Sequence, residues 1–378
     1  MPADEADVIA AIELAREMRV PILPRGGGTS QCGQTVGEAL VIDNSRHLNG
    51  ITAFDAQAMT VEVQPGVVLD QLNAYLKPHG LWFPVDVSTS AQATLGGMAG
   101  NNSCGSRSIA YGNMVHNVLG IDAILSDGVS EHFGPFGVDA GRPMGSGRSG
   151  QLVSSLFALG ARERDEIERV WPKVLRRVGG YNLDVFHPQS ERPYTADGSV
   201  NLAHLLVGSE GTLAYFRRLR LKLAPLPKAR VLGVVNYPTF WAAMDSAQHI
   251  VKLGPSAVEL VDRTMIELAR ENPVFRPTID RALIERDGKL PEAILLVEFA
   301  GDEREPLLRS LAQLVELIGD LGLPGAVVEM PEEKAQKALW DVRKAGLNIM
   351  MSLKGDGKPV SFIEDCAVPL EHLAEYTD

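Results

Sequence analysis

The stretch at residues 21–37, PILPRGGGTSQCGQTVG, places three consecutive glycines and two small hydroxyl residues directly after a short apolar run. Ile22 and Leu23, which prolines flank, predict a short strand. The glycines that follow lack the side chains that keep a ligand away from the backbone, so successive N–H groups can point at an anion. We therefore expect an anion-binding loop directly after a strand.

Polar residues around these glycines favour a diphosphate as the anion. Thr29 and Ser30 add hydroxyl donors, and Arg25 adds positive charge. No Gly-Lys-Ser/Thr follows and no G-x-G-x-x-G opens a helix, so neither a Walker loop nor a Rossmann-type dinucleotide loop fits. A plain surface turn stays open as the alternative, because glycine triplets are common in loops.

Two more glycine clusters follow, TLGGMAGNNSCG at residues 94–105 and GSEGTL at residues 208–213. The cluster at 94–105 adds Thr, Asn and Ser side chains that suit the edge of a heterocycle or a phosphate. A glycine-rich turn is again the alternative, but a second polar glycine cluster is harder to explain as chain reversal alone. The cluster at 208–213 does not favour serine hydrolysis, because Ser209 does not fit Gly-x-Ser-x-Gly and no His and acid partners stand out.

Composition indicates an ordinary globular protein of two or three domains, with 378 residues, 45% hydrophobic and 22% charged. The net charge of −12 disfavours non-specific binding to nucleic acid or to an anionic membrane surface. No apolar run is long enough to span a bilayer, so we expect at most peripheral membrane association. Cys32, Cys104 and Cys366 are too scattered for a disulfide framework or a C-x-x-C metal site, which favours the reducing cytoplasm.

Hydrophobic patterning predicts both α and β elements along the chain. Residues 118–125 predict a strand that returns antiparallel through residues 129–133. A charged helix is expected over residues 163–178, and a buried strand over residues 205–207. Beyond the Pro-Leu-Pro at residues 225–227 the composition changes to alternating strands and helices, which is typical of a second α/β or α+β domain.

In this order and with these neighbours, the three glycine clusters resemble the FAD-linked oxidases and dehydrogenases of the vanillyl-alcohol oxidase type, with their PCMH-type FAD-binding fold. The resemblance covers nearly the whole chain and is nearest to the D-2-hydroxyglutarate, D-lactate and glycolate dehydrogenases. The stretch NNSCGSRSIAYG at residues 101–112 is most similar to long bacterial members with a C-terminal iron–sulfur module. The implied fold is α+β, with a two-subdomain PCMH-type FAD-binding domain at 1–226 and an α/β cap domain for the substrate at 227–378.

The resemblance also implies a set of FAD-binding residues in and around the three clusters. These are Arg25, Gly26, Gly27, Gly28, Thr29, Ser30, Gln34, Pro84, Asp86, Thr94, Gly96, Gly97, Asn101, Asn102, Ser103, Gly105, Tyr111, Gly112, Glu210 and Gly211. We expect the FAD to be held without a covalent bond.

The implied activity is oxidation of a D-2-hydroxy acid, of the 2-hydroxyglutarate, lactate or glycolate type, to the 2-oxo acid, with electrons leaving through the flavin to an acceptor other than NAD. An arginine suits the carboxylate of such an acid. Arg343 is the first choice for this clamp, Lys354 and Lys358 are cationic helpers, and Asp365 completes the candidate catalytic residues with Arg343 and Lys358. The alternative for each of these cations is an exposed, solvated charge.

Two other functions stay open. The first alternative is an FAD-binding subunit or fragment without catalysis of its own. The second is a nicotinamide-dependent flavin reductase of the same fold. The expected partners are a small hydroxy acid and an electron acceptor, which is an iron–sulfur module, a quinone or an electron-transfer protein. A homodimer is compatible with the sequence.

The chain departs from the resembled family at both ends. The family has a further strand before the first helix, and it continues past the Asp-x-x-x-Pro segment to a His-Gly-His type motif that binds a metal. This chain ends at Asp378, so we expect a fragment that is incomplete at its C-terminus. Its own histidines are isolated, and we assign no metal ligand among them. Any iron–sulfur cluster or divalent metal is expected only on sequence outside this chain.

Overall fold

The computed structural model describes residues 1–30, 33–136, 148–190, 192–346 and 366–377. The chain divides into two compact units, which are described separately. Unit 1 consists of Met1–Gly105 and Tyr111–Leu226, and unit 2 of Ser106–Ala110 and Pro227–Asp378. The chain therefore leaves unit 1 directly after the second glycine cluster, contributes five residues to unit 2, and returns.

A five-stranded antiparallel sheet forms the centre of unit 1, and the two strands predicted over residues 118–125 and 129–133 are confirmed as neighbours in it. These two strands follow each other in the sequence, whereas the central strand of the sheet comes from the C-terminal end of the unit. In sheet order the strands are β3 (Ile51–Asp55), β4 (Thr60–Val63), β10 (Tyr215–Lys222), β6 (Val118–Ile124) and β7 (Ser130–Phe133).

A second, two-stranded parallel sheet carries the first glycine loop. It pairs β1 (Ile22–Arg25) with β2 (Leu40–Asp43), and the loop starts where β1 ends. Helix α1 (Glu5–Met18) precedes β1, and its apolar side packs with Ile42 and Tyr215 in a small core. Unit 1 further contains α2 (Leu69–Leu76), η1 (Lys77–His79), β5 (Leu81–Trp82), α3 (Leu95–Asn101), α5 (Met114–Asn117), β8 (Pro135–Phe136), α6 (Arg148–Arg162), α7 (Arg164–Val170), η3 (Leu183–Phe186), β9 (Val200–Asn201), α8 (Ala203–Leu206) and β11 (Ala224–Pro225), while α4 (Ser108–Tyr111) spans the boundary to unit 2.

Two expected elements of unit 1 are wrong. The helix expected over residues 163–178 is only α7, which ends at Val170 because Trp171 precedes Pro172 and takes an extended conformation. The strand expected over residues 205–207 is instead the short helix α8 with Val207 in extended conformation after it. A short buried apolar run has no period that separates helix from strand.

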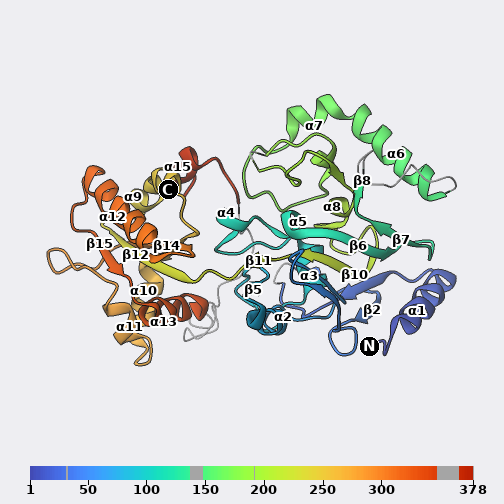
Figure 1. Cartoon of the computed structure of the whole chain (residues 1–378), viewed down its shortest axis with the longest axis horizontal. Helices are drawn as coiled ribbons and strands as arrows, with labels where there is room; N and C mark the ends of the chain where they lie inside the picture. The colour runs from blue at the N-terminus through green and yellow to red at the C-terminus, as the bar shows by residue number, and fades with distance from the viewer. Residues whose placement is uncertain (31–32, 137–147, 191, 347–365, 378) are drawn as a thin grey trace. The chain divides into compact units, whose positions relative to one another are not determined.

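Unit 2 is a four-stranded antiparallel sheet with helices on both faces. Helices α9 and α12 lie on one side of the sheet and α10, α11 and α13 on the other (Figure 1). The sheet order is β13-β14-β12-β15, and alternate strand residues enter the two apolar cores. The elements are β12 (Ala229–Tyr237), α9 (Phe240–Ile250), η4 (Val251–Leu253), β13 (Ala257–Asp262), α10 (Arg263–Glu271), α11 (Arg276–Asp280), β14 (Ala293–Gly301), α12 (Arg304–Asp320), β15 (Val327–Met330), α13 (Glu333–Lys344), η5 (Leu370–His372) and α15 (Leu373–Thr377).

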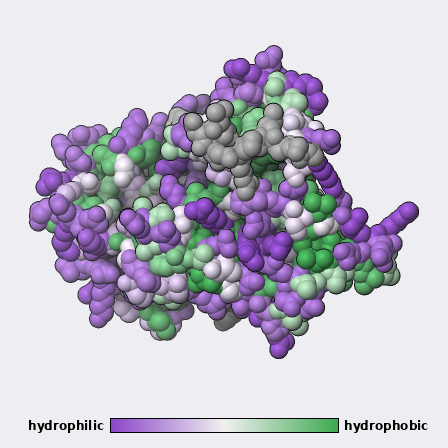
Figure 2. All heavy atoms as spheres, turned by 45° about the vertical axis from the view of Figure 1, so that its right-hand side comes forward, coloured by the Kyte–Doolittle hydropathy of each residue, from purple (hydrophilic) through white to green (hydrophobic). Residues whose placement is uncertain are grey.

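Hydrophilic residues cover most of one face of the protein (Figure 2). On the face drawn in Figure 2, apolar residues appear in separate patches among hydrophilic ones. Among the described residues, no helix has the length and apolar character that a bilayer crossing requires.

Candidate functional site

The first two glycine clusters meet in unit 1. A Cβ added at Gly26 would lie 2.0 Å from Thr94 Oγ1 and 3.7 Å from the backbone nitrogen of Gly97. A Cβ added at Gly27 would lie 2.2 Å from the carbonyl oxygen of Gln92. Only glycine permits this approach, because real Cβ atoms do not come so close to other atoms. The loop after β1 is thus packed against the start of α3.

The third cluster closes on the second from the other side. The backbone N–H of Gly208 donates to Ala99 O at 2.9 Å, and that of Glu210 donates to Gly100 O at 2.9 Å. Both acceptors are carbonyls in the last turn of α3, and that of Ala99 also accepts from the backbone N–H of Asn102 at 3.1 Å. A Cβ added at Gly211 would also lie 3.2 Å from Pro24 Cδ, next to the first cluster. All three clusters that the sequence singled out therefore lie together.

Several buried polar atoms around these clusters have no partner among the described residues. They include Thr94 Oγ1, Asn102 Nδ2 and Ser209 Oγ, on side chains that are at most 2% exposed. A buried donor or acceptor without a hydrogen bond costs free energy, so such groups usually meet a ligand or a water molecule. Orphaned hydroxyl and amide groups beside glycines that leave the backbone bare fit a polar, extended cofactor such as FAD.

Arg25 has a partner inside the protein. Its Nη2 donates to Asp43 Oδ2 at 3.1 Å across the parallel pair of β1 and β2. Burial raises the pKa of Asp43, but hydrogen bonds from Ser45 and Arg25 outweigh it and hold that pKa below its ordinary value. Arg25 is therefore placed at the first cluster by Asp43, and its contact with a phosphate stays a prediction.

The other predicted cofactor residues occupy four places. In the first loop, Thr29 and Ser30 are half-buried and Gly28 has positive φ, while Gln34 Oε1 is buried without a partner among the described residues. Gly96 lies against Pro65, and Asn101 Nδ2 donates to Ser103 Oγ at 3.0 Å. The segment that contains Pro84 and Asp86 lies beside Gly105, because a Cβ added at Gly105 would be 2.3 Å from Asp86 Oδ1. Tyr111 packs edge-on to Trp82, and Gly112 lies against His116.

A buried ion pair that the sequence did not indicate supports the third cluster. Arg177 Nη2 lies 2.9 Å from Asp184 Oδ1 and also donates to Asn182 Oδ1 at 2.6 Å. Asn182 Nδ2 in turn donates to Val207 O at 2.8 Å, directly before Gly208. The stretch at residues 179–183 thus supports the third cluster through Asn182, and nothing in the local sequence marks Arg177 and Asp184 as a buried pair.

Two histidines next to this network, the half-buried His116 and the buried His204, predict a pH-dependent stability. Burial lowers the pKa of both His116 and His204 from 6.5 to about 4. The unfolded chain therefore binds more protons than the folded one between these values, and stability falls as the pH falls from about 6.5 towards 4. Each histidine contributes up to about 2 kcal/mol to the loss between about pH 7 and pH 5.

Urea unfolding at a series of pH values checks this prediction. His204 Nε2 donates to Val118 O at 2.9 Å, and His204→Gln keeps an N–H donor there without a titrating ring. The variant is expected to lose less stability than the wild type when the pH is lowered. An equal loss in both proteins would contradict a neutral buried His204.

In unit 2, Arg343 is held at the C-terminal end of α13 by a glutamate. Its Nε and Nη2 lie 2.9 and 2.7 Å from Glu259 Oε2 on β13, and no described residue pairs with Nη1. Glu259 thus uses Nε and Nη2, and the N–H groups on Nη1 are donors that this ion pair does not use. Lys354, Lys358 and Asp365 lie outside the described residues. The described part of the chain contains no group of three His, Cys, Asp or Glu side chains that could hold a metal.

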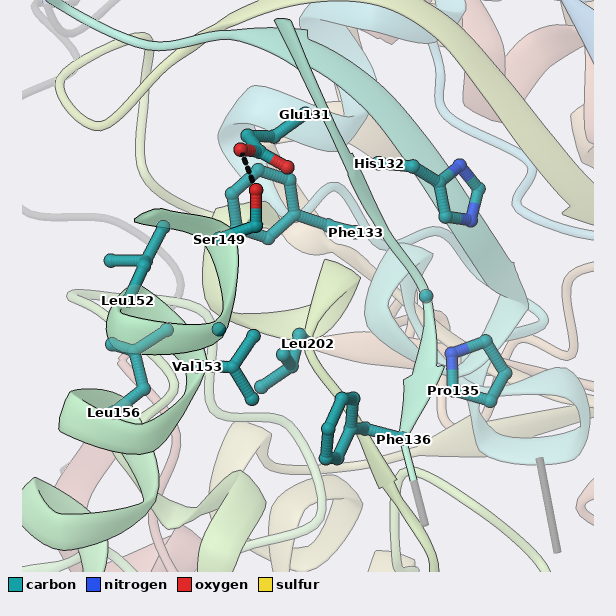
Figure 3. A pocket seen from close by; sticks show the side chains of 12 residues that line it. Glu131, His132, Phe133, Pro135, Phe136, Ser149, Leu152, Val153, Leu156 and Leu202 are labelled. Carbon is teal, nitrogen blue, oxygen red and sulfur yellow. Dashed lines mark hydrogen bonds between the residues drawn. The ribbon is translucent and has the colours of Figure 1, made fainter. Parts of the chain in front are cut away.

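A cavity of about 190 Å³ lies elsewhere in unit 1, between β7, β8 and α6. Val153 of α6 lies beside Leu202 (Figure 3), and Phe136, Leu152 and Leu156 also line the cavity. No predicted FAD-binding residue lines this cavity. It is therefore separate from the candidate site.

Comparison with known families agrees with the geometry of the glycine clusters. The family model of the FAD binding domain matches residues 1–134, and that of the C-terminal domain of FAD linked oxidases matches residues 226–378. The structure of alkyldihydroxyacetonephosphate synthase matches with a TM-score of 0.61 at 18% identity, over 93% of this chain and 54% of that one. This structural likeness shows the fold.

The sequence is also similar to curated dehydrogenases along its whole length. D-2-hydroxyglutarate dehydrogenases of Pantoea ananatis and Escherichia coli are each 34% identical over 99% of this chain, which spans 37% of their length. The mitochondrial cytochrome D-lactate dehydrogenase of Arabidopsis thaliana is 28% identical over 99% of this chain and 53% of its own length. The resemblance predicted from the three glycine clusters is confirmed: the chain contains an FAD binding domain followed by the C-terminal domain of FAD linked oxidases.

Proposed function

We propose that this chain forms the flavin-binding and substrate-binding part of a dehydrogenase that oxidises a 2-hydroxy acid of the D-2-hydroxyglutarate, D-lactate or glycolate type to the 2-oxo acid. The observation that carries the proposal is the convergence of three glycine clusters around buried polar side chains that lack protein partners. The names of the relatives that match 99% of the chain support the class of substrate.

The proposed roles of the residues follow from their chemistry. When bound, FAD supplies an acceptor for the hydride on the carbon that bears the hydroxyl group. The backbone at Gly27 and Gly28 approaches the diphosphate, while Thr94 and Asn102 offer side-chain hydrogen bonds. Arg343 binds the substrate carboxylate through the end of its guanidinium that Glu259 leaves free. Fixing the carboxylate orients the reacting C–H bond, which is the main contribution a protein makes to cofactor chemistry.

The proposal extends to the electron acceptor, the cellular location and the oligomeric state. We propose that electrons leave to an iron–sulfur module, a quinone or an electron-transfer protein, and that a homodimer is the assembly to test first. Scattered cysteines favour a cytoplasmic location.

An anaerobic spectroscopic titration tests the proposed function on the longest form of the protein in which this chain occurs. We expect the purified protein to be yellow and to bleach on addition of D-2-hydroxyglutarate, D-lactate or glycolate, but not of L-2-hydroxyglutarate. Bleaching by NADPH alone would support the reductase. Bound flavin that no hydroxy acid bleaches would support a subunit without catalysis of its own.

The flavin is predicted to be bound without a covalent link. Cys104 lies in the second cluster, but its sulfur accepts a hydrogen bond from Arg176 Nε at 2.8 Å and is thereby engaged within the protein. Acid precipitation is expected to leave a colourless pellet and a yellow supernatant, and Cys104→Ser is expected to keep its flavin. Yellow colour that stays in the wild-type pellet and is lost from the Cys104→Ser pellet would identify a cysteinyl flavin instead.

A further inference from the structure

Helix α13 carries the proposed carboxylate clamp, and apolar packing alone does not fix its position. Leu339 and Val342 are buried against the sheet, among Leu232, Val234 and Leu296. Such contacts are non-directional, so they hold the helix on the sheet without defining its rotation and register to the accuracy that a substrate clamp requires. Directional contacts, such as hydrogen bonds and ion pairs, are therefore needed to fix the rotation and register of α13.

Two glutamates stand on the sheet face that α13 covers. The register of the antiparallel pair β13–β14 places Ala257 opposite Glu298 and Glu259 opposite Leu296. Because opposite residues share a face and so do residues two apart, Glu259 and Glu298 lie on the same face of adjacent strands. Each of them holds an arginine: Glu259 holds Arg343, and Glu298 holds Arg107.

The pair of Arg107 and Glu298 is built for a fixed geometry. Glu298 is only 1% exposed, and Arg107 Nε and Nη2 donate to its two oxygens at 2.8 and 2.7 Å. Ser256 Oγ donates to the same carboxylate at 3.1 Å. A buried carboxylate needs such partners, and the planar guanidinium fork matches both oxygens at once. Arg107 is thus immobilised, although it lies 191 residues away from Glu298 in the sequence.

The immobilised guanidinium contacts α13 directly. Arg107 Cζ lies 5.2 Å from the ring centroid of Trp340, which is the geometry of a cation–π contact. Trp340 and Arg343 are three residues apart on α13 and therefore neighbours on the helix surface. Arg107 holds the helix at Trp340, and Glu259 holds it one turn later at Arg343.

We propose that Arg107 is a positioning residue for Arg343 and acts through the ring of Trp340. The inference rests on the proposed function, because it takes Arg343 as the carboxylate clamp. Arg107 follows the second glycine cluster after Gly105 and Ser106, in the segment that unit 1 contributes to unit 2. The chain segment that continues the proposed cofactor loop thereby also sets the position of the proposed substrate clamp.

Arg107→Lys tests the proposal with the smallest change. Lysine keeps a positive charge beside Glu298, but it offers neither the two-pronged fork nor the flat face that stacks on Trp340. We expect KM for D-2-hydroxyglutarate to rise about tenfold and kcat to fall by less, because Arg343 is still present but its guanidinium is less well positioned for the carboxylate. Trp340→Leu removes the other half of the contact and is expected to act in the same direction.

Matched controls separate positioning from a general effect on folding. Arg263→Lys changes an arginine of the same unit that contacts Glu267 and the loop before β14 but not α13. It is expected to leave KM unchanged. In an Arg343→Lys background, Arg107→Lys is expected to change KM by less than about twofold, because a residue that acts through Arg343 has little left to act on. Equal effects of Arg107→Lys in both backgrounds would overturn the proposal.

Hydrogen exchange of the α13 amides gives a measurement that does not depend on turnover. In the absence of substrate, exchange at the C-terminal half of α13 is expected to rise in Arg107→Lys and Trp340→Leu but not in Arg263→Lys. Unchanged exchange in the first two variants would overturn the proposal whatever the activity. If instead α13 loosens as expected but the wild type bleaches with none of the hydroxy acids, the proposed function fails while the contact of Arg107 with α13 stands.

Discussion

Gly97→Val is expected to give a folded protein that retains little FAD. A Cβ added at Gly97 would meet only the side-chain atom Thr94 Oγ1, at 3.3 Å, so a small movement of Thr94 makes room for a side chain and no backbone outside α3 blocks it. That room lies where the first and second glycine clusters meet, which is the space assigned to the cofactor. An inserted branched side chain typically costs about 1–3 kcal/mol, so the affinity for FAD should fall roughly tenfold to a hundredfold.

The flavin absorbance per protein after gel filtration, together with the thermal unfolding temperature of the flavin-free protein, measures this result. Gly319→Val is the matched control, since a Cβ at Gly319 on α12 meets nothing within 4 Å. Gly27→Val is less discriminating because its Cβ would lie 2.2 Å from Gln92 O, so the loop itself must shift. A Gly97→Val protein with full FAD content would remove the second cluster from the cofactor site.

The sequence predicts the glycine clusters well because each close approach leaves a local mark. Gly26 and Gly27 are required where the loop touches Thr94 and Gln92, and no other residue type can stand there without displacing the chain. Clusters of consecutive glycines are therefore visible in the sequence before any contact is known. The antiparallel pair of β6 and β7 can also be predicted from the local sequence, because a turn signal separates two regular apolar patterns.

Contacts between distant residues leave no such mark. Arg25 carries the charge expected of a phosphate ligand, but its partner Asp43 becomes apparent only when β1 and β2 pair in parallel. Arg107 and Glu298 are 191 residues apart, and neither has a local pattern that distinguishes it from a solvated surface charge. Buried ion pairs of this kind depend on tertiary packing, which a local periodicity cannot encode.

Arg343→Ala is expected to lower kcat/KM for the hydroxy acid by about thirtyfold or more while the FAD content stays normal. Truncating one partner of a hydrogen-bonded charge pair costs about 2–5 kcal/mol, and about 2 kcal/mol corresponds to thirtyfold. The Arg343 side chain is 40% exposed, which favours the lower end of this range. Steady-state kinetics of the longest form of the protein measures the effect.

The Glu259 carboxylate offers the control that separates substrate binding from local structure. Its side chain is 17% exposed, so Arg343→Ala leaves a half-hidden charge without its partner and could perturb β13 for that reason alone. Adding Glu259→Gln to Arg343→Ala removes the orphaned charge. If Arg343 binds the substrate carboxylate, the double variant regains stability but not kcat/KM, whereas recovery of kcat/KM would show that the loss came from Glu259. An unchanged kcat/KM in Arg343→Ala would place Arg343 on the solvated surface and leave the carboxylate to a residue outside the described ranges.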